Sequence, residues 1–291
     1  MSEQLLTVDD LRVEYQTRKG PVHAVRGVSF TVGREKVGIV GESGSGKSQT
    51  GRAILRLVPP TGRVTARRLQ FEEVDLMAAD ERTMRDVRGK RIAMVLQDPK
   101  FSLNPVMTVG RQIAEAYRAH ADMSRAAAEQ KALDMLASVR MRDPRRVYDS
   151  YPHELSGGMG QRAMIAMMLG TEPDLLIADE PTSALDVTVQ MQVLAILDDL
   201  VTERGMGLIF ISHDLNLVAS FCDRVLVMYA GRIVEQLSAA ALSQAKHPYT
   251  QGLLAALPRI DQPTHELAVL RRDPAWAAEP PERMTATDPV A

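Results

Sequence analysis

The sequence predicts an α/β fold with a mostly parallel central sheet, and three observations support this prediction. Residues 37–40, 174–180 and 207–212 are short apolar runs with the length of buried strands. The first two of these runs are each followed by a turn and then by apolar residues at helical spacing. Residues 5–15 and 22–32 alternate apolar and polar side chains and are rich in β-branched residues, which is typical of antiparallel strands. We therefore expect an antiparallel subdomain beside the central sheet.

The composition is that of a soluble globular protein of one large domain or two small ones. The chain has 291 residues, of which 45% are hydrophobic and 25% charged. A net charge of −2 gives no basic footprint for nucleic acid. The single cysteine, Cys222, excludes an internal disulfide and suits a reducing compartment. The acidic residues 1–10 lack the apolar core of a secretory signal, so none is expected, and no apolar run approaches the ~18 residues that cross a bilayer. Any membrane role is thus expected to be peripheral, through a partner.

The glycine-rich turn at 41–48 follows the pattern G-x-x-x-x-G-K-[ST]. Its residues are Gly41, Glu42, Ser43, Gly44, Ser45, Gly46, Lys47 and Ser48. Glycines allow positive φ angles, so that backbone N–H groups can point inward at a polyanion. Lys47 would then reach the β- and γ-phosphates of a nucleotide, and the Ser48 hydroxyl would ligate Mg²⁺. A flexible glycine-serine turn is the plain alternative, but the strand before it and the helix after it favour a nucleotide site.

The remaining elements are predicted from apolar spacing and turn residues. Expected strands lie at 63–76 (one strand and a turn), 91–97, 174–180, 207–212, 224–229 and 232–236. Expected helices lie at 80–86, within 106–139, from 157 onward, and at 187–203 and 248–257. Ser124 is expected to cap one helix of an insertion, whereas 142–154 is expected to be a loop. The end of the chain, 261–291, is rich in Pro, Ala, Glu and Thr and is expected to be an irregular tail.

Several polar residues stand where expected strands end. Asp179 and Glu180 close an apolar strand, where one carboxylate can hold Mg²⁺ and the next can orient or deprotonate a water molecule. Such a pair is as often a turn or helix cap. His213 and Gln97 also follow strands, at the edge where ligands collect in α/β sheets, although a lone histidine is more often structural. Tyr15 could stack on adenine or serve as a core residue of an edge strand.

Ser156 precedes two glycines that open a helix, so its N–H groups are open to an anion. In chain order, the phosphate loop, Gln97, LSGGM (155–159), LLIADE (175–180), SALD (183–186) and SHD (212–214) resemble the ATP-binding subunit of an ABC transporter. The resemblance covers about residues 5–260. It implies a P-loop NTPase (RecA-like) core with an antiparallel β subdomain and an α-helical insertion, which is the ABC ATPase fold. The implied ABC domain spans 1–260, with a helical subdomain at about 100–165 and a family extension at about 238–260.

Longer segments resemble, more narrowly, the ATPases of dipeptide, oligopeptide and nickel importers. They are QDPKFSLNPVMTVG (97–110), RAMIAMML (162–169), VMYAGRIVE (227–235) and HPYTQGLLAALP (247–258). That family commonly uses two different ATPase subunits, and SGSGKSQT and SALD are similar to its first type. The implied partners are a second homologous ATPase subunit, two transmembrane permease subunits and an extracytoplasmic solute-binding protein, with no nucleic acid. The implied location is peripheral, on the cytoplasmic face of the bacterial inner membrane.

The resemblance also implies the roles of individual residues. Glu180 would be the catalytic carboxylate, with His213 and Gln97 as further catalytic residues. The implied cofactors are ATP and Mg²⁺, and the implied metal ligands are Ser48, Gln97 and Asp179. The residues expected to contact nucleotide are Tyr15, the loop Gly41 to Ser48, Gln49, Ser156, Gly157, Gly158 and Asp186. Among them, 156–158 would serve the ATP of a head-to-tail partner, and Asp186 would lie near the dimer interface. Some relatives hold an iron–sulfur cluster in a cysteine-rich C-terminus; no cysteine follows Cys222, so no such cluster is expected.

Other functions remain open at this point. The same machinery could carry nickel, an opine or another small solute instead of peptides. A soluble ABC ATPase acting outside transport is a second possibility. A third is an ATP-sensing module without turnover, against which the intact Glu180 and His213 argue. Gly160 departs from the Arg or Gln usual after the LSGGM signature, which puts the first turn of that helix in question.

Overall fold

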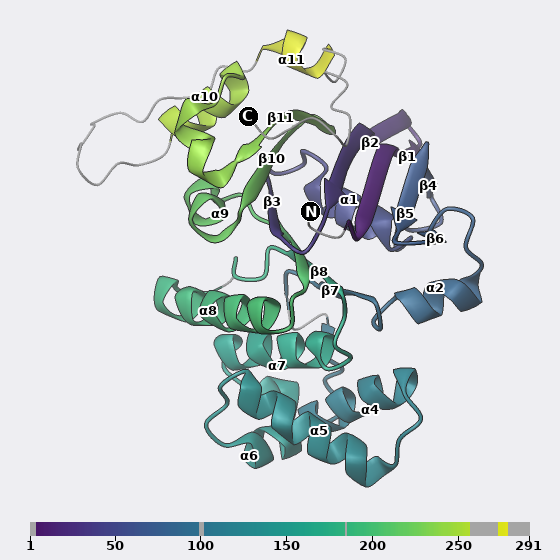
Figure 1. Ribbon diagram of the computed structural model, residues 1–291, viewed down its shortest axis with the longest axis vertical. Helices are drawn as coiled ribbons and strands as arrows, with labels where there is room; N and C mark the ends of the chain where they lie inside the picture. Colours follow the sequence, from purple (N-terminus) through teal and green to yellow (C-terminus); the bar gives the residue numbers. More distant parts are fainter. Residues whose placement is uncertain (1–3, 99–101, 184, 257–272, 279–291) are drawn as a thin grey trace. The chain divides into compact units, whose positions relative to one another are not determined.

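A computed structural model describes residues 4–98, 102–183, 185–256 and 273–278 (Figure 1). The chain divides into two compact units. Unit 1 consists of Met1–Ala79 together with Ile209–Ala291, and unit 2 consists of Asp80–Leu208. The division falls within strand β9 (Gly207–Ile211). Each unit has its own apolar interior, and each is described separately.

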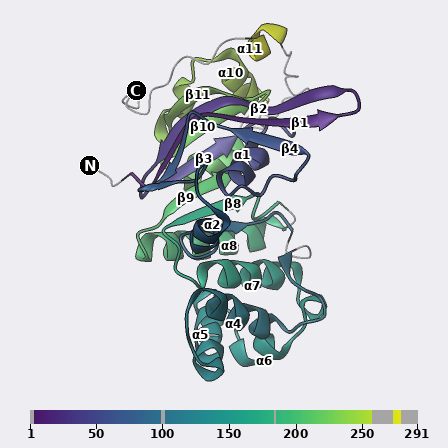
Figure 2. The same ribbon diagram turned by 90° about the vertical axis from the view of Figure 1, so that its right-hand side faces the viewer.

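Unit 1 contains the predicted antiparallel strands. Strands β1 (Leu6–Thr17) and β2 (Gly20–Val32) pair over their whole length and form the long hairpin drawn in purple in Figure 2. Residues 63–76 were expected to form one strand and a turn, but they form three strands. These are β4 (Gly62–Thr65), β5 (Arg68–Phe71) and β6 (Val74–Asp75). The last of these strands is separate because Glu72 turns the chain at φ 47° between β5 and β6.

The second sheet of unit 1 has β3 (Lys36–Val40) parallel to β10 (Arg224–Tyr229), and β11 (Arg232–Ser238) antiparallel to β10. Helix α1 (Lys47–Ile54) follows β3, as predicted. Helix α9 (Leu215–Phe221), which the sequence analysis did not predict, begins at the Asp214 cap. It packs so closely on β3 that a Cβ on Gly38 would lie 2.1 Å from Val218 Cγ1. Its seven residues are too few for a periodic apolar pattern to stand out.

The C-terminal part of unit 1 has a 3₁₀ helix, η2 (Ala239–Gln244), and helix α10 (Pro248–Ala255). Helix α10 was expected to reach residue 257, which lies outside the described residues. The tail was expected to be irregular, yet Pro274–Ala278 form the short helix α11. Asp273 accepts a hydrogen bond from Ala275 N, so an Asp-Pro helix start explains this difference. The rest of 261–291 lies outside the described residues.

Unit 2 begins with helix α2 (Glu81–Val87), capped by Asp80 as predicted. Strand β7 (Ile92–Val95) is parallel to β8 (Leu175–Asp179), and all four residues of β7 and all five of β8 are buried. The helices are α4 (Val109–His120), α5 (Arg125–Ser138), α6 (Pro144–Asp149), α7 (Gly157–Leu169) and α8 (Val187–Glu203), with a 3₁₀ turn, η1 (Pro152–Glu154). Ser124 accepts a hydrogen bond from Ala127 N and caps α5, as predicted.

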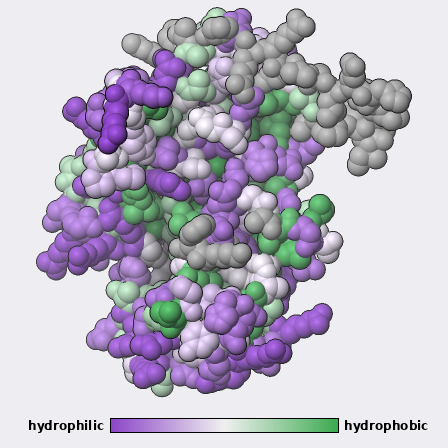
Figure 3. All heavy atoms as spheres, turned by 180° about the vertical axis from the view of Figure 1, so that it is seen from behind, coloured by the Kyte–Doolittle hydropathy of each residue, from purple (hydrophilic) through white to green (hydrophobic). Residues whose placement is uncertain are grey.

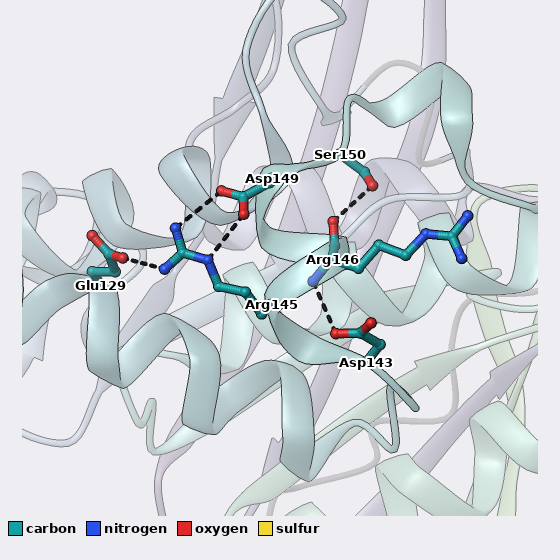
Figure 4. A network of polar contacts seen from close by, with 6 residues as sticks. All are labelled: Glu129, Asp143, Arg145, Arg146, Asp149 and Ser150. Carbon is teal, nitrogen blue, oxygen red and sulfur yellow. Dashed lines mark hydrogen bonds and ion pairs between the residues drawn. The ribbon is translucent and has the colours of Figure 1, made fainter.

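Helix α6 corrects the prediction of a continuous loop at 142–154. Asp143 accepts a hydrogen bond from Arg146 N (3.0 Å), and Pro144 fills the first helical position. Arg145 then joins this helix to α5, because its guanidinium donates to Glu129 (2.5 Å) and to Asp149 (2.9 Å) (Figure 4). A cap and a charged bridge to a neighbouring helix thus stabilise a segment that its composition alone did not reveal as helical.

Candidate active site

The phosphate loop of unit 1 has the backbone that its glycines were predicted to allow. Gly41 has φ 151°, Gly44 has φ 80°, and Gly46 is the left-handed N-cap of α1 at φ 102°. A Cβ on Gly41 would lie 2.1 Å from Met228 O, and one on Gly46 would lie 2.4 Å from Ala24 O. Backbone on two sides therefore excludes a side chain at both positions. At Gly44 a Cβ would meet nothing within 4 Å, so this part of the loop is open.

Lys47 lies with its ammonium group folded over the loop. Its Nζ donates to Gly41 O (2.7 Å) and to Glu42 O (2.9 Å), and the residue is 5% exposed. No side chain caps the N-terminus of α1, which leaves the positive end of the helix dipole directed at the loop. The Ser45 hydroxyl is buried with no hydrogen-bond partner among the described residues. These donors, gathered on one loop, fit an anion such as a polyphosphate.

Neighbouring elements hold the loop from outside. Gly231 N, in the turn between β10 and β11, donates to Ser45 O (2.9 Å), and Arg26 N of β2 donates to Gly231 O (2.7 Å). Tyr249 of α10 accepts a hydrogen bond from Glu42 N at 3.0 Å and is completely buried. The sequence analysis placed Tyr249 only within a family extension and gave it no role. No local pattern could have linked it to Glu42, because 207 positions separate the two residues.

Two other predicted nucleotide contacts, Tyr15 and Gln49, lie together in unit 1. The Tyr15 hydroxyl donates to Gln49 Oε1, which joins the end of β1 to α1. One edge of the Tyr15 ring packs on Gly62, where a Cβ would lie 2.7 Å from Tyr15 Cε1. Tyr15 is partly exposed, so one part of its ring contacts protein and another contacts solvent. The arrangement leaves adenine stacking as a prediction.

His213 follows the end of β9, as the sequence analysis expected. Ser212 N donates to Ile39 O (3.1 Å), so the chain leaves β9 beside the end of β3, from which the phosphate loop starts. The Ser212 hydroxyl accepts a hydrogen bond from Asp214 N (3.0 Å), which fixes the turn around the exposed His213. Within unit 1 the structure therefore brings His213 and the phosphate loop to the same end of neighbouring strands.

In unit 2 the predicted catalytic residues Gln97 and Glu180 are in contact. Gln97 Nε2 donates to Glu180 Oε2 at 3.1 Å. The two residues meet because β7 and β8 are parallel, with Val95 opposite Ala178, so that both chains leave the sheet at the same edge. Asp179, the last residue of β8, is 3% exposed. Glu180 has φ 47°, a conformation that a side chain of this type adopts at a cost of about 1–3 kcal/mol and that is common at functional sites.

The segment at 155–159 opens helix α7 with an exposed N-terminus. Ser156 caps the helix by accepting from Met159 N, and Ser156 and Gly157 are both exposed. A Cβ on Gly158 would lie 2.4 Å from Val189 Cγ1 of α8. Asp186 caps α8 by accepting from Val189 N (3.0 Å). The two helix starts that carry predicted nucleotide contacts therefore pack side by side within unit 2.

Gly160, whose place in the signature helix was in question, lies in the first turn of α7. The residue is buried, and its N–H donates to Ser156 O at 2.8 Å. The helical first turn is thus formed with glycine at this position.

Comparison with known families agrees with these features. The ABC transporter family profile matches residues 25–183, which include the phosphate loop, the signature and the carboxylate pair. The chain belongs to the ABC transporter family. Its fold is the ABC ATPase cassette, with a phosphate loop and an antiparallel subdomain. The chain is therefore an ATPase subunit of an ABC transporter.

Individual relatives extend the match over most of this ABC ATPase. It is 52% identical over 260 residues to y4tR of Sinorhizobium fredii, named as a probable peptide ABC transporter ATP-binding protein, covering 88% of this chain and 78% of that protein. It is 48% identical over 268 residues to the dipeptide transport ATP-binding protein DppD of Escherichia coli, covering 91% and 82%. The ATP-binding cassette MJ0796, solved as a dimer in a post-hydrolysis state with ADP and Pi, has a TM-score of 0.71 at 26% identity, covering 81% and 99%.

The next features of this ABC ATPase are the hydropathy of its helices and of its surface. Among the described residues, no helix has both the length and the apolar character needed to span a bilayer. The face drawn in Figure 3 is mostly hydrophilic, with small separate hydrophobic patches. In the same described part, no cluster of three or more His, Cys, Asp or Glu side chains could hold a metal ion.

Proposed function

We propose that this ABC ATPase drives the import of di- or oligopeptides. The observation that supports this substrate class is the 48% identity to the dipeptide transport protein DppD over 91% of the chain. An oligopeptide transport ATP-binding protein, OppD of Bacillus subtilis, is 46% identical over 96% of the chain. Nickel, an opine or another small solute is the alternative cargo of the same machinery. A soluble role outside transport is the alternative of a different class.

For ATP, we propose that the phosphate loop and Lys47 bind the β- and γ-phosphates. Lys47 would exchange its two carbonyl acceptors, Gly41 O and Glu42 O, for phosphate oxygens. Tyr15 would stack on adenine, with Gln49 holding its hydroxyl. The proposed ligands of a bound Mg²⁺ are Ser48, Gln97 and Asp179. Such an ion, when bound, neutralises phosphate charge.

For hydrolysis, we propose that Glu180 orients and deprotonates the attacking water and that His213 contacts the γ-phosphate. The hydrogen bond from Gln97 fixes one Glu180 oxygen and so orients the carboxylate that would accept the proton. The capped, exposed start of α7 at Ser156, Gly157 and Gly158, together with Asp186, would meet the ATP of a second, homologous ATPase subunit. Two permease subunits and an extracytoplasmic binding protein complete the proposed importer, and the ATPase lies peripherally on the cytoplasmic face of the membrane.

The catalytic assignment is tested by Glu180→Gln, with the exposed Glu203→Gln on α8 as the matched control. We expect Glu180→Gln to retain ATP binding, to lose turnover by about a hundredfold or more, and to accumulate as a closed dimer on ATP. Glu203→Gln should behave like the unaltered protein in all three measurements. Full turnover in Glu180→Gln would refute the assignment.

The cargo is tested in cells that lack the chromosomal gene. We expect the unaltered gene to restore uptake of a labelled dipeptide, and a Lys47→Ala copy to fail, because the ammonium group that holds the phosphates is lost. Calorimetry should show weaker ATP binding by Lys47→Ala. Restored uptake of labelled nickel without uptake of peptides would assign the alternative cargo.

A further inference from the structure

Four arginines from four strands line one pocket of unit 1, which we call the arginine pocket. They are Arg12 of β1, Arg26 of β2, Arg63 of β4 and Arg232 of β11. Strand pairing brings three of them together. Arg12 of β1 lies opposite Arg26 of β2, and Glu14, two residues further along β1, lies opposite Arg63 of β4. The pocket has a volume of about 340 Å³, and none of the phosphate-loop residues 41–48 lines it.

Few carboxylates balance this positive charge. Arg12 is paired with Asp10 (2.7 Å), and the lining residue Glu14 is paired with His23 (3.2 Å). Within the part of the chain that the structure describes, no acidic side chain forms an ion pair with the other three arginines. The arginine pocket therefore has a surplus of positive charge that the protein itself does not neutralise.

Arg232, one of the residues that line this pocket, has a buried donor. Its Nε is buried and has no hydrogen-bond partner among the described residues, although a buried donor left unpaired is costly. Burial lowers the pKa of the Arg232 guanidinium, and the nearby charges of Arg26 and Arg12 lower it further. An anion in the pocket would both accept from Nε and offset the repulsion among the three guanidinium groups.

We propose that the arginine pocket binds free phosphate or the phosphate group of a small phosphomonoester. This site is separate from the ATP site. Guanidinium groups present planar pairs of N–H donors that match phosphate oxygens, and the double charge of a phosphate balances two arginines at once. The volume suits a free phosphate ion or a small phosphomonoester and is at the lower end of the range for small-molecule sites. Thr65 adds a hydroxyl at the rim.

The test must read the pocket locally, because the phosphate loop also binds phosphate. We would follow the Arg232 Nε–H signal by nuclear magnetic resonance in the full chain, identify it by its loss in Arg232→Lys, and titrate inorganic phosphate and glycerol phosphate in separate experiments. The signal should shift and saturate with at least one probe, and the tighter probe identifies the source of the phosphate. An Arg232 signal that stays in place while phosphate-loop amides shift would overturn the proposal.

Variants then assign the binding to these side chains. Arg232→Gln and Arg63→Gln should each weaken phosphate binding, read from the Arg26 Nε–H signal, by about tenfold or more. The matched control is Arg125→Gln, which removes the same charge from an exposed position on α5 of unit 2 and should change the affinity by less than about twofold. Arg63 is exposed, so Arg63→Gln should fold. This variant tests the site even if Arg232→Gln does not fold. Equal affinities in Arg63→Gln and the control would refute the site.

Discussion

Replacing Tyr249 by phenylalanine should loosen the phosphate loop from a position far away in the sequence. The hydroxyl of Tyr249 accepts the Glu42 N–H at 3.0 Å, and Tyr249 is completely buried. Phenylalanine keeps the ring and its contacts with Tyr229 (4.6 Å between centroids) and Trp276 (6.0 Å). The substitution therefore removes the hydroxyl that accepts the Glu42 N–H and keeps the aromatic packing.

The size of the effect follows from the loss of that hydrogen bond, which is part-buried. Removing the acceptor of such an N–H costs up to about 1–3 kcal/mol. If this whole free energy is lost from the closed state of the loop, the equilibrium constant for loop opening rises roughly five- to 150-fold. Amide hydrogen exchange of Glu42 N–H measures this opening directly, and it should accelerate by that factor in Tyr249→Phe without nucleotide.

Tyr229→Phe provides the matched control. Tyr229 belongs to the same aromatic cluster and packs on Tyr249, but its hydroxyl has no hydrogen bond within the described residues. Removing it should leave exchange at Glu42 unchanged. The reasoning is wrong if both variants exchange at the rate of the unaltered chain, or if both accelerate equally, since the second result would indicate a general loss of packing.

Three further predictions concern other parts of the chain. Gly158→Ala should lower the free energy of unfolding in urea by about 1–3 kcal/mol, because the added Cβ would lie 2.4 Å from Val189 Cγ1. Gly157→Ala should have little effect, since its Cβ would lie 3.8 Å from the nearest atom, and equal losses in the two variants would contradict this reasoning. Burial raises the pKa of the Cys222 thiol from 9.0 to about 12, so at pH 8 a disulfide reagent should label the folded chain only as it opens, and immediate labelling would count against burial. Between pH 9 and about 12 the unfolded chain releases this proton and the folded chain keeps it, so stability should fall as pH rises through that window. Arg145→Gln should slightly lower the melting temperature at low salt and not at high salt, because its ion pairs are exposed; a loss independent of salt would indicate a packing role.

The sequence analysis was most successful where a function needs residues close together along the chain. The phosphate loop, the carboxylates that end β8 and the glycines that open α7 are each local patterns, and the structure has the expected strand or helix at each of them. The pairing of Gln97 with Glu180 was not predicted as a contact, although both residues were selected. It follows from the parallel register of β7 and β8, which the sequence alone did not specify.

The features that were missed depend on residues distant in sequence or on very short elements. Helix α6 and strand β6 have six and two residues, too few for a periodic pattern. The arginine pocket takes one residue from each of four strands, so no segment of the chain shows it. Arg145 is exposed, and its guanidinium bridges α6 and α5 through Glu129. Neighbouring residues in the sequence thus indicated neither the arginine pocket nor the ion-pair partners of Arg145.

The phosphate loop itself shows why distant residues should matter for nucleotide affinity. A free glycine-rich loop would lose conformational entropy on binding, at about 1–2 kcal/mol for each residue that becomes ordered. Here three separate elements already order the loop: the backbone at Ala24 and at Gly231, and the side-chain hydroxyl of Tyr249. Folding has therefore met that cost before ATP arrives, and the interactions with phosphate can contribute more of their free energy to affinity. It follows that substitutions that loosen these supports should weaken ATP binding without touching any group that contacts ATP, whereas substitutions at the open Gly44 should act only through the local backbone.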